Sequence, residues 1–378
     1  MTKRRTSFQA TDTDRTDRSE KRMKSTNSRP IDYEPCDWHE EVHITYNVSI
    51  LVHEADPANK IIKKVLKVNT DLYGNEALPF EVQFVGLIPS CNRIVRPIAH
   101  SMNDPHPGYG TAIFEHYPLG DLAQWRETTI RTEDFDMVPE IHIWRFFLQI
   151  AQGLALIQNQ IGPNCEERKV LLHRDIKPKN ILVADNGSDH PSFRLHDFGC
   201  AKVWKKSVAR QKSYSGTYEW QPPENPIINT KAADIWALGA CVHFLANGKC
   251  PIESRSNYAS TILAGGAGHP ISTQNYKNPD RYYAARVPRC ITPINLSPDE
   301  QRNLGYGPSI VNEHDIFNAQ YSDTLNEWME RCLSVSPSKR PTAERLMNDM
   351  GPEARRMLTK LGGAKALIDM DIKIDGEG

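Results

Sequence analysis

The sequence predicts an α+β fold of two lobes, in which a small strand-rich N-lobe precedes a larger, mainly helical C-lobe. Strand-like runs rich in β-branched and aromatic residues occupy 43–52, 60–68 and 111–117. From Pro139 onward the apolar residues recur with a helical period, and the run 233–248 is apolar nearly all round, as in a buried helix. With 378 residues, the chain is long enough to bury a substantial core.

The chain is expected to contain four successive segments. They are a disordered basic tail (1–30), the N-lobe (31–117), the C-lobe (118–350, with an insertion at about 252–320) and a C-terminal extension (351–378). The tail contains no Leu, Ile or Val, so it cannot bury enough apolar surface to offset the entropy lost on ordering. The insertion is loosely composed and rich in Pro, Asn and Tyr.

Four helices are expected from periodicity and end signals. One covers 77–88 and begins at Pro79, and another restores a helical period at 321–335. The long helix after Pro139 places one set of apolar residues on a single face: Trp144, Phe147, Leu148, Ala151, Leu154 and Ala155. The helix at 233–248 ends at an Asn-Gly pair, and the glycine is expected to terminate it.

Composition excludes several classes of protein. The formal net charge is −1 and charged residues make up 25%, so there is no overall attraction to nucleic acid or to a membrane surface. The eight cysteines are scattered, which favours reduced thiols over a disulfide framework or a zinc site. The longest apolar run, 235–246, is shorter than the roughly 20 residues that span a bilayer, and the N-terminus is too polar for a secretory signal. We expect a cytoplasmic or nuclear protein.

The stretch "LLHRDIKPKN" (171–180) groups the residue types that phosphoryl transfer requires. Such a reaction needs cations on the transferred group, oxygen ligands for a metal, and a base beside the attacking hydroxyl. Asp175 can orient and deprotonate a hydroxyl, Lys177 can contact a γ-phosphate, and Asn180 offers a neutral oxygen ligand.

A second carboxylate follows in "HDFG" (196–199). Strand-like segments on either side of the turn 184–189 predict a hairpin, which would bring Asn180 and Asp197 together as metal ligands. Gly199 is expected to permit the sharp backbone turn after Asp197.

Six motifs in one order make the chain resemble the eukaryotic-type protein kinases over roughly residues 40–350. The motifs are "VLK" (65–67), "HRDIKPKN" (173–180), "DFG" (197–199), "GTYEWQPPE" (216–224), "DIWALG" (234–239) and "KRP" (339–341). The resemblance implies a bilobal protein-kinase fold, ATP and Mg²⁺ as cofactors, and transfer of the γ-phosphate to proteins. Lys177 and Thr217 are similar to the lysine and threonine of the serine/threonine-directed members, so Ser/Thr hydroxyls are the expected acceptors.

The resemblance also assigns the nucleotide contacts. Lys67 resembles the strand lysine that holds the α- and β-phosphates, and Glu81 is its expected partner on the following helix. Phe114 would be the gatekeeper, and the backbone of "EHY", from Glu115 to Tyr117, would bind adenine. Asp121 lies where a ribose contact is usual.

Structural and regulatory roles follow from the same resemblance. Three roles are structural: His173 packs under Phe198, Asp234 fixes the backbone of the catalytic loop, and Glu224 pairs with Arg340. Arg174 resembles the arginine that binds a phosphorylated residue of the activation segment, 197–224, and Ser213 is the first candidate for that residue. Expected partners are protein substrates and, as a candidate, an upstream activating kinase.

The chain departs from the family pattern in its first hairpin. There is no glycine before Gly74, and the hairpin within 41–54 is expected to turn at Tyr46-Asn47, where asparagine tolerates left-handed geometry. Val65, two residues before Lys67, replaces a smaller alanine above adenine. These departures motivate an alternative reading, a pseudokinase scaffold with little turnover. A small-molecule phosphotransferase would not account for "GTYEWQPPE" or "KRP".

Overall fold

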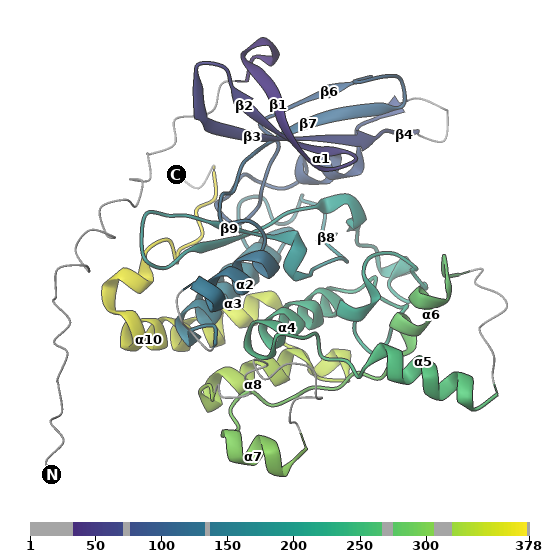
Figure 1. The fold of residues 1–378 in the computed structure, drawn as a ribbon, viewed down its shortest axis with the longest axis vertical. Helices are drawn as coiled ribbons and strands as arrows, with labels where there is room; N and C mark the ends of the chain where they lie inside the picture. Colours follow the sequence, from purple (N-terminus) through teal and green to yellow (C-terminus); the bar gives the residue numbers. More distant parts are fainter. Residues whose placement is uncertain (1–32, 71–75, 133–136, 267–274, 306–319, 376–378) are drawn as a thin grey trace, which may run out of the picture. The chain divides into compact units, whose positions relative to one another are not determined.

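The first lobe is built on a five-stranded antiparallel sheet in the order β1-β2-β3-β7-β6 (Figure 1). This computed structural model describes residues 33–70, 76–132, 137–266, 275–305 and 320–375. The strands of the sheet are β1 (Trp38–Thr45), β2 (Val48–His53), β3 (Asp56–Lys67), β6 (Ala99–Met102) and β7 (Tyr109–Glu115). A short pair, β4 (Asn69–Thr70) with β5 (Glu76–Ala77), follows β3. The predicted tail at 1–30 lies outside the described residues.

The run 43–52, expected to be strand-like, is divided between two strands. A turn at Tyr46-Asn47 separates β1 from β2, as predicted. The expected left-handed asparagine is not used, since neither turn residue has a positive φ. The ladder instead carries an irregularity between His43 and Thr45, and such bulges change the local twist of a hairpin.

A short helix, α1 (Phe80–Val85), connects the sheet to the rest of the molecule. It begins after Pro79, as predicted, because proline suits the start of a helix and interrupts its interior. Val82 and Val85 are buried, whereas Phe80 stays exposed. Helix α1 therefore presents one apolar side, and it places Glu81 in the same buried layer.

The second lobe is mainly helical. Its principal helices are α2 (Leu122–Thr132), α3 (Glu140–Ile157), α4 (Lys231–Asn247), α5 (Arg255–Ala264), α6 (Pro279–Arg286), α7 (Pro298–Asn303), α8 (Asp323–Cys332) and α10 (Gly351–Gly362). A short turn of helix, α9 (Ala343–Arg345), and a π-helical stretch (Leu346–Met350) lead directly into α10. The described parts of the predicted insertion at 252–320 include α5, α6 and α7.

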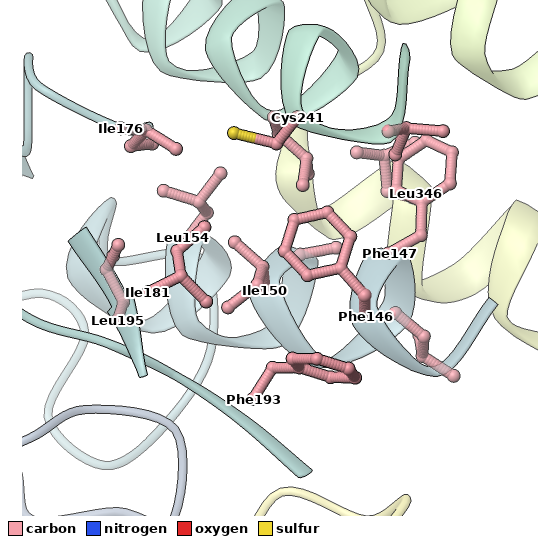
Figure 2. Packing of buried hydrophobic residues seen from close by; sticks show 14 of the residues in the cluster. Phe146, Phe147, Ile150, Leu154, Ile176, Ile181, Phe193, Leu195, Cys241 and Leu346 are labelled. Atoms are coloured by element: carbon pink, nitrogen blue, oxygen red, sulfur yellow. The ribbon is translucent and has the colours of Figure 1, made fainter. Parts of the chain in front are cut away.

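Helix α3 is the centre of the core. The sequence predicted that one face of this helix is buried. In the structure every residue from Ile141 to Ile157 is buried, so the predicted buried surface was too small. Neighbouring elements cover it on all sides, and Figure 2 shows Phe146 and Phe147 packing between Phe193 and Leu346. Burying a side chain of this size contributes about 1.5–3 kcal/mol. This core anchors the segments that carry the site.

Helix α4 is buried almost all round and ends as predicted. Gly248 takes a left-handed φ of 73°, and its N–H closes the last turn on the carbonyl of Phe244. Gly239 lets α4 approach α8, since a Cβ there would lie 2.7 Å from the Cβ of Cys332. All eight cysteines are free thiols, as expected. None of the helices in the described ranges is both long and apolar enough to span a bilayer.

The interior holds histidines in their neutral form. On α4, Nε2 of His243 accepts a hydrogen bond from the backbone N–H of Thr292 at 3.1 Å, so Nδ1 donates to the carbonyl of Lys249 at 2.9 Å. A second proton, on Nε2 of His243, would face the N–H of Thr292 and would have no acceptor. Burial accordingly lowers the pKa of His243 to about 4, and it lowers the pKa of His142 to about 3 and that of His196 to about 4.

Stability should therefore fall between pH 6.5 and pH 4. The unfolded chain takes up protons at these histidines near pH 6.5 while the folded chain does not, so acidification favours unfolding by up to about 1.4 kcal/mol per histidine and pH unit. Urea unfolding followed by tryptophan fluorescence at pH 7 and pH 5.5 measures the change. His243→Gln should flatten the dependence. Equal unfolding free energies for the wild type at both pH values would contradict the assignment.

Candidate functional site

The loop that carries Asp175 is held by one buried carboxylate. Asp234, on the first turn of α4, accepts hydrogen bonds from the backbone N–H groups of His173 (3.0 Å) and Arg174 (2.9 Å), as predicted. Arg174 has a φ of 66°, a costly conformation that these bonds help to maintain. The ring of His173 packs edge-on against Phe198, with ring centroids 4.8 Å apart. The loop's shape therefore depends on the core helix below it.

Asp175, Lys177, Asn180 and Thr217 form one hydrogen-bonded cluster. The ammonium of Lys177 donates to Asp175 Oδ2 and to Thr217 Oγ1, both at 2.8 Å. The backbone N–H of Thr217 donates to Asp175 Oδ1 at 2.8 Å. Asn180 Nδ2 donates to the carbonyl of Asp175 at 2.8 Å, and to its Oδ2 at 3.2 Å. The structure thus brings together four residues predicted from the sequence.

A hairpin brings Asn180 near Asp197, as the sequence predicted. Strands β9 (Ile181–Ala184) and β10 (Ser192–Leu195) pair antiparallel, with Leu195 opposite Ile181. The N–H of His196 then donates to the carbonyl of Asn180 at 3.1 Å. Asp197 itself, and not Gly199, makes the sharp turn, with a φ of 62°. The Gly199 N–H donates to the Asp197 carboxylate at 3.3 Å and so supports this turn.

The assignment of the strand lysine to Lys67 is wrong. Lys64 Nζ lies 2.5 Å from Glu81 Oε2 and 3.5 Å from Asp197 Oδ1, whereas Lys67 is exposed at the end of β3. Side chains alternate between the two faces of a strand, so positions 64 and 67 point in opposite directions. Glu81 is confirmed as the glutamate of the pair.

The signal that separates the two lysines is the face of β3 to which each belongs. Ile62 and Leu66, which share the parity of Lys64, pack against the cluster that contains Phe114 and Tyr117. The position two residues before the lysine is therefore Ile62 and not Val65, and it too is bulkier than the expected alanine. Both lysines lie in one strand-like run, 60–68, so local sequence alone did not distinguish them.

The Lys64 ammonium is stabilised in its charged form. Burial opposes the charge, but Glu81 and Asp197 outweigh burial and raise the pKa of Lys64. Burial likewise opposes ionisation of Asp197, and Lys64 chiefly offsets it, so the pKa of Asp197 lies below its ordinary value. A cation and an anion are therefore both present at this point at neutral pH.

The side chains of the hinge, Glu115 to Tyr117, bond to one another and to β10. The Tyr117 hydroxyl donates to Glu115 Oε2 at 2.9 Å, and Arg194 donates to the same hydroxyl at 2.7 Å. The contact between the hinge backbone and adenine stays a prediction. Asp121 Oδ1 caps α2 by accepting from Ala123 N at 2.9 Å. Its ribose contact stays a prediction.

The glycine-free hairpin is fastened to β3. Asn47 donates from its side chain to the carbonyl of Val65 at 3.1 Å, and the N–H of Val65 donates to the carbonyl of Asn47 at 2.8 Å. Tyr46 projects fully into solvent. The turn is therefore held by hydrogen bonds to the neighbouring strand, and not by the conformational freedom of glycine.

The activation segment lies directly over the catalytic loop. Arg174 donates to the carbonyl of Cys200 at 2.8 Å, to Ser213 Oγ at 3.1 Å and to Asn229 Oδ1 at 2.9 Å. Gly216, with a φ of 80°, permits the activation segment to approach the catalytic loop, since a Cβ there would lie 2.6 Å from the carbonyl of Arg174. All three acceptors of Arg174 are neutral oxygens.

The end of the activation segment is tied to the late helices by an ion pair. Arg340 donates in bidentate fashion to the two carboxylate oxygens of Glu224, at 2.6 and 2.7 Å, which confirms the expected pairing. The Arg340 side chain is completely buried, so loss of either partner would leave an unpaired charge.

The donor set suits a nucleotide with a hard divalent cation. Neither the amide oxygen of Asn180 nor Oδ2 of Asp197 accepts a hydrogen bond from the described residues. No group of three or more His, Cys, Asp or Glu side chains in the described ranges could hold a metal by itself. Mg²⁺ characteristically takes few protein oxygens and completes its shell with phosphates and water. Asn180 and Asp197 would hold it.

Comparison with known proteins gives a consistent result. The family model described as "Protein kinase domain" matches residues 46–350. Serine/threonine-protein kinase Nek3 of Mus musculus is 33% identical over 169 residues, which is 43% of this chain and 29% of the relative. The probable serine/threonine-protein kinase nek2 of Dictyostelium discoideum is 30% identical over 202 residues, or 51% and 43%.

A third relative is mitogen-activated protein kinase kinase 2 of Arabidopsis thaliana. It is 25% identical over 190 residues, which is 50% of this chain and 46% of the relative. In all three cases, the chain spans less than half the length of the curated relative.

Exchanging each of the two lysines for methionine should separate their roles. Lys64→Met removes the cation between Glu81 and Asp197 and should weaken Mg·ATP binding by about 10–100-fold, the usual worth of a charged hydrogen bond. Lys67→Met, the matched control on the same strand, should leave the affinity for Mg·ATP within about twofold of the wild-type value. Isothermal titration calorimetry measures both affinities. Equal losses in the two variants would count against the assignment of Lys64.

Proposed function

The chain belongs to the protein kinase family, and from that premise we propose that it transfers the γ-phosphate of ATP to serine and threonine hydroxyls of proteins. The observation that carries the proposal is the connected set of Asp175, Lys177 and Thr217, with the Lys64–Glu81 ion pair already formed. Protein kinases use ATP with a divalent metal. Mg²⁺ is the metal we propose here, because the two available protein ligands are oxygens.

Asp175 orients the acceptor hydroxyl and takes its proton. Its Oδ1 is fixed by the N–H of Thr217, and its Oδ2 is bonded to Lys177 and Asn180. A carboxylate held on both oxygens cannot rotate freely, so the hydroxyl meets it in one orientation. Lys177 lies beside it and places its positive charge where charge develops on the transferred group.

Lys64 and the metal-holding residues align the nucleotide, which is the phosphoryl donor. Lys64, already paired with Glu81, contacts the nucleotide phosphates, and Asn180 and Asp197 hold the metal that neutralises them. The bound nucleotide and metal supply the phosphoryl group and its charge neutralisation. The chain's own contribution is therefore positioning and fixed charge, which is the greater part of catalysis in phosphoryl transfer.

Lys177 and Thr217 support serine and threonine as acceptors. The Thr217 hydroxyl accepts from Lys177 while the Thr217 N–H donates to Asp175, so one residue bridges the base and the cation. The relatives whose names specify serine/threonine-protein kinases agree with this assignment. Protein substrates follow from the family.

Turnover should depend on Asp175. Asp175→Asn keeps the shape of the side chain but removes the base, and we expect the rate constant to fall by about 10²–10⁴-fold. Transfer of ³²P from labelled ATP to a mixed serine and threonine peptide library measures it. If the wild type and Asp175→Asn label peptides equally, the enzyme assignment fails and a non-catalytic scaffold takes its place.

Phosphorylation of Ser213 should raise activity. Its hydroxyl lies 3.1 Å from the guanidinium of Arg174, whose acceptors among the described residues are neutral, so a phosphate there would add a charge-assisted contact. We propose that an upstream kinase, or the chain itself, modifies this residue. Ser213→Ala should lower kcat/KM several-fold, while Ser207→Ala in the same segment should not. Mass spectrometry that finds Ser213 unmodified in the active protein would refute the proposal.

A further inference from the structure

The last described residues of the chain form a strap that lies against α3 of the second lobe. This C-terminal strap, residues 366–375, follows α10 and is the yellow segment that leaves that helix in Figure 1. Three residues spaced along α3 bind its backbone carbonyls: Arg145 to Ala366 and Ile368, Gln149 to Asp369, and Gln152 to Met370. The predicted extension at 351–378 is therefore fastened to the core helix over its described part.

The strap also pairs with the segment that follows α1. Cys91 forms an isolated bridge with Ile374, and the N–H of Asp375 donates to the carbonyl of Ser90 at 2.9 Å. The Asn92 side chain donates to Asp369 Oδ1 at 2.7 Å and accepts from the N–H of Lys373 at 2.8 Å. These bonds join parts of the chain that are about 280 positions apart.

Arg93 is the charged centre of this contact. Its side chain is completely buried, and its guanidinium donates to Asp369 Oδ2 at 3.2 Å, to the Asp369 carbonyl at 2.6 Å and to the Asp371 carbonyl at 3.0 Å. Within the described ranges, Asp369 supplies the carboxylate that compensates this buried cation. Removing one partner of a buried pair is costly, because the other charge is left without compensation.

The segment that follows α1 also connects the two carboxylates of the nucleotide site, Glu81 and Asp197. On one side it continues from α1, which carries Glu81. On the other, the N–H of Leu195 donates to the Arg93 carbonyl at 2.9 Å, and the N–H of Val95 donates to the Leu195 carbonyl at 3.0 Å. Leu195 precedes Asp197 by two residues. Asp369 also accepts from Ser192 Oγ, at the start of β10, at 2.7 Å.

We propose that Asp369 is a positioning residue for phosphoryl transfer, and this inference rests on the proposed function. By neutralising Arg93 and bonding to Asn92 and Ser192, it fixes the segment after α1 against β10. That segment sets the separation of Glu81 and Asp197, between which Lys64 lies. Loss of the carboxylate loosens this arrangement and weakens nucleotide binding, although Asp369 touches neither nucleotide nor substrate.

The test compares two matched substitutions in the full chain. Asp369→Asn preserves volume and tolerates the left-handed φ of 56° at this position, but it removes the charge. Asp371→Asn removes the same charge two residues away, where the side chain is 81% exposed and pairs with Arg355. We expect Asp369→Asn to raise the KM for ATP at least about fivefold, and Asp371→Asn to stay within about twofold.

Hydrogen exchange distinguishes positioning from general destabilisation. Asp369→Asn should speed exchange of amides in α1 and at 90–95 by at least about tenfold, while amides of the distant helix α8 stay as in the wild type. Unchanged KM and exchange in a folded Asp369→Asn, or equal deprotection of α1 and α8, would overturn the proposal. If this variant does not fold, Asn92→Ala, which breaks the strap contact without exposing a charge, is judged by the same criteria.

Failure of the proposed function gives a different result. A wild-type protein that lacks turnover refutes the phosphotransfer assignment. The affinity for ADP and the hydrogen exchange of α1 can still be measured in that protein, and they test the role of Asp369. Loss of α1 protection in Asp369→Asn under those conditions supports the inference, and unchanged protection contradicts it.

Discussion

The ammonium of Lys64 lies between two carboxylates that come from different parts of the chain, Glu81 on α1 and Asp197 after β10. This contact joins the sheet of the first lobe to the segment that ends the β9–β10 hairpin. Lys64 and Glu81 are largely buried, and Lys64 remains charged because the carboxylates of Glu81 and Asp197 compensate its ammonium. The arrangement persists only if α1 and β10 are held at a fixed distance, and much of the remaining structure contributes to that.

Buried polar groups provide this support at several points. Asp234 holds the catalytic loop from α4, Arg340 holds the end of the activation segment through Glu224, and Arg93 holds the segment after α1. In each case one charged side chain meets several partners, which limits the cost of burying it. Each of these side chains has at least one partner 60 or more positions away in sequence. These contacts therefore hold the segments of the site in fixed positions on the close-packed helical core.

Much of the site was predictable because its residues lie in contiguous motifs. Asp175, Lys177 and Asn180 occupy one loop, and the hairpin between 181 and 195 needed only two short strands and a turn to bring Asp197 near. The helix at 233–248 and its terminating glycine followed from composition. The strand lysine was misplaced because its identity depends on which face of β3 is turned toward α1. Both lysines lie in one strand-like run, and their spacing of three residues does not show which face is turned toward α1.

By itself, the sequence determined the two-lobed α+β class, the course of the main helices, and the set of residues able to act on a phosphate. Periodicity and local motifs contain that information, because they depend on neighbours within a few positions. The tertiary structure alone decided that Lys64 and not Lys67 meets Glu81, that α3 is buried on every side, and that Asp369 compensates Arg93. Those outcomes depend on which distant segments pack together, and no local spacing encodes that choice.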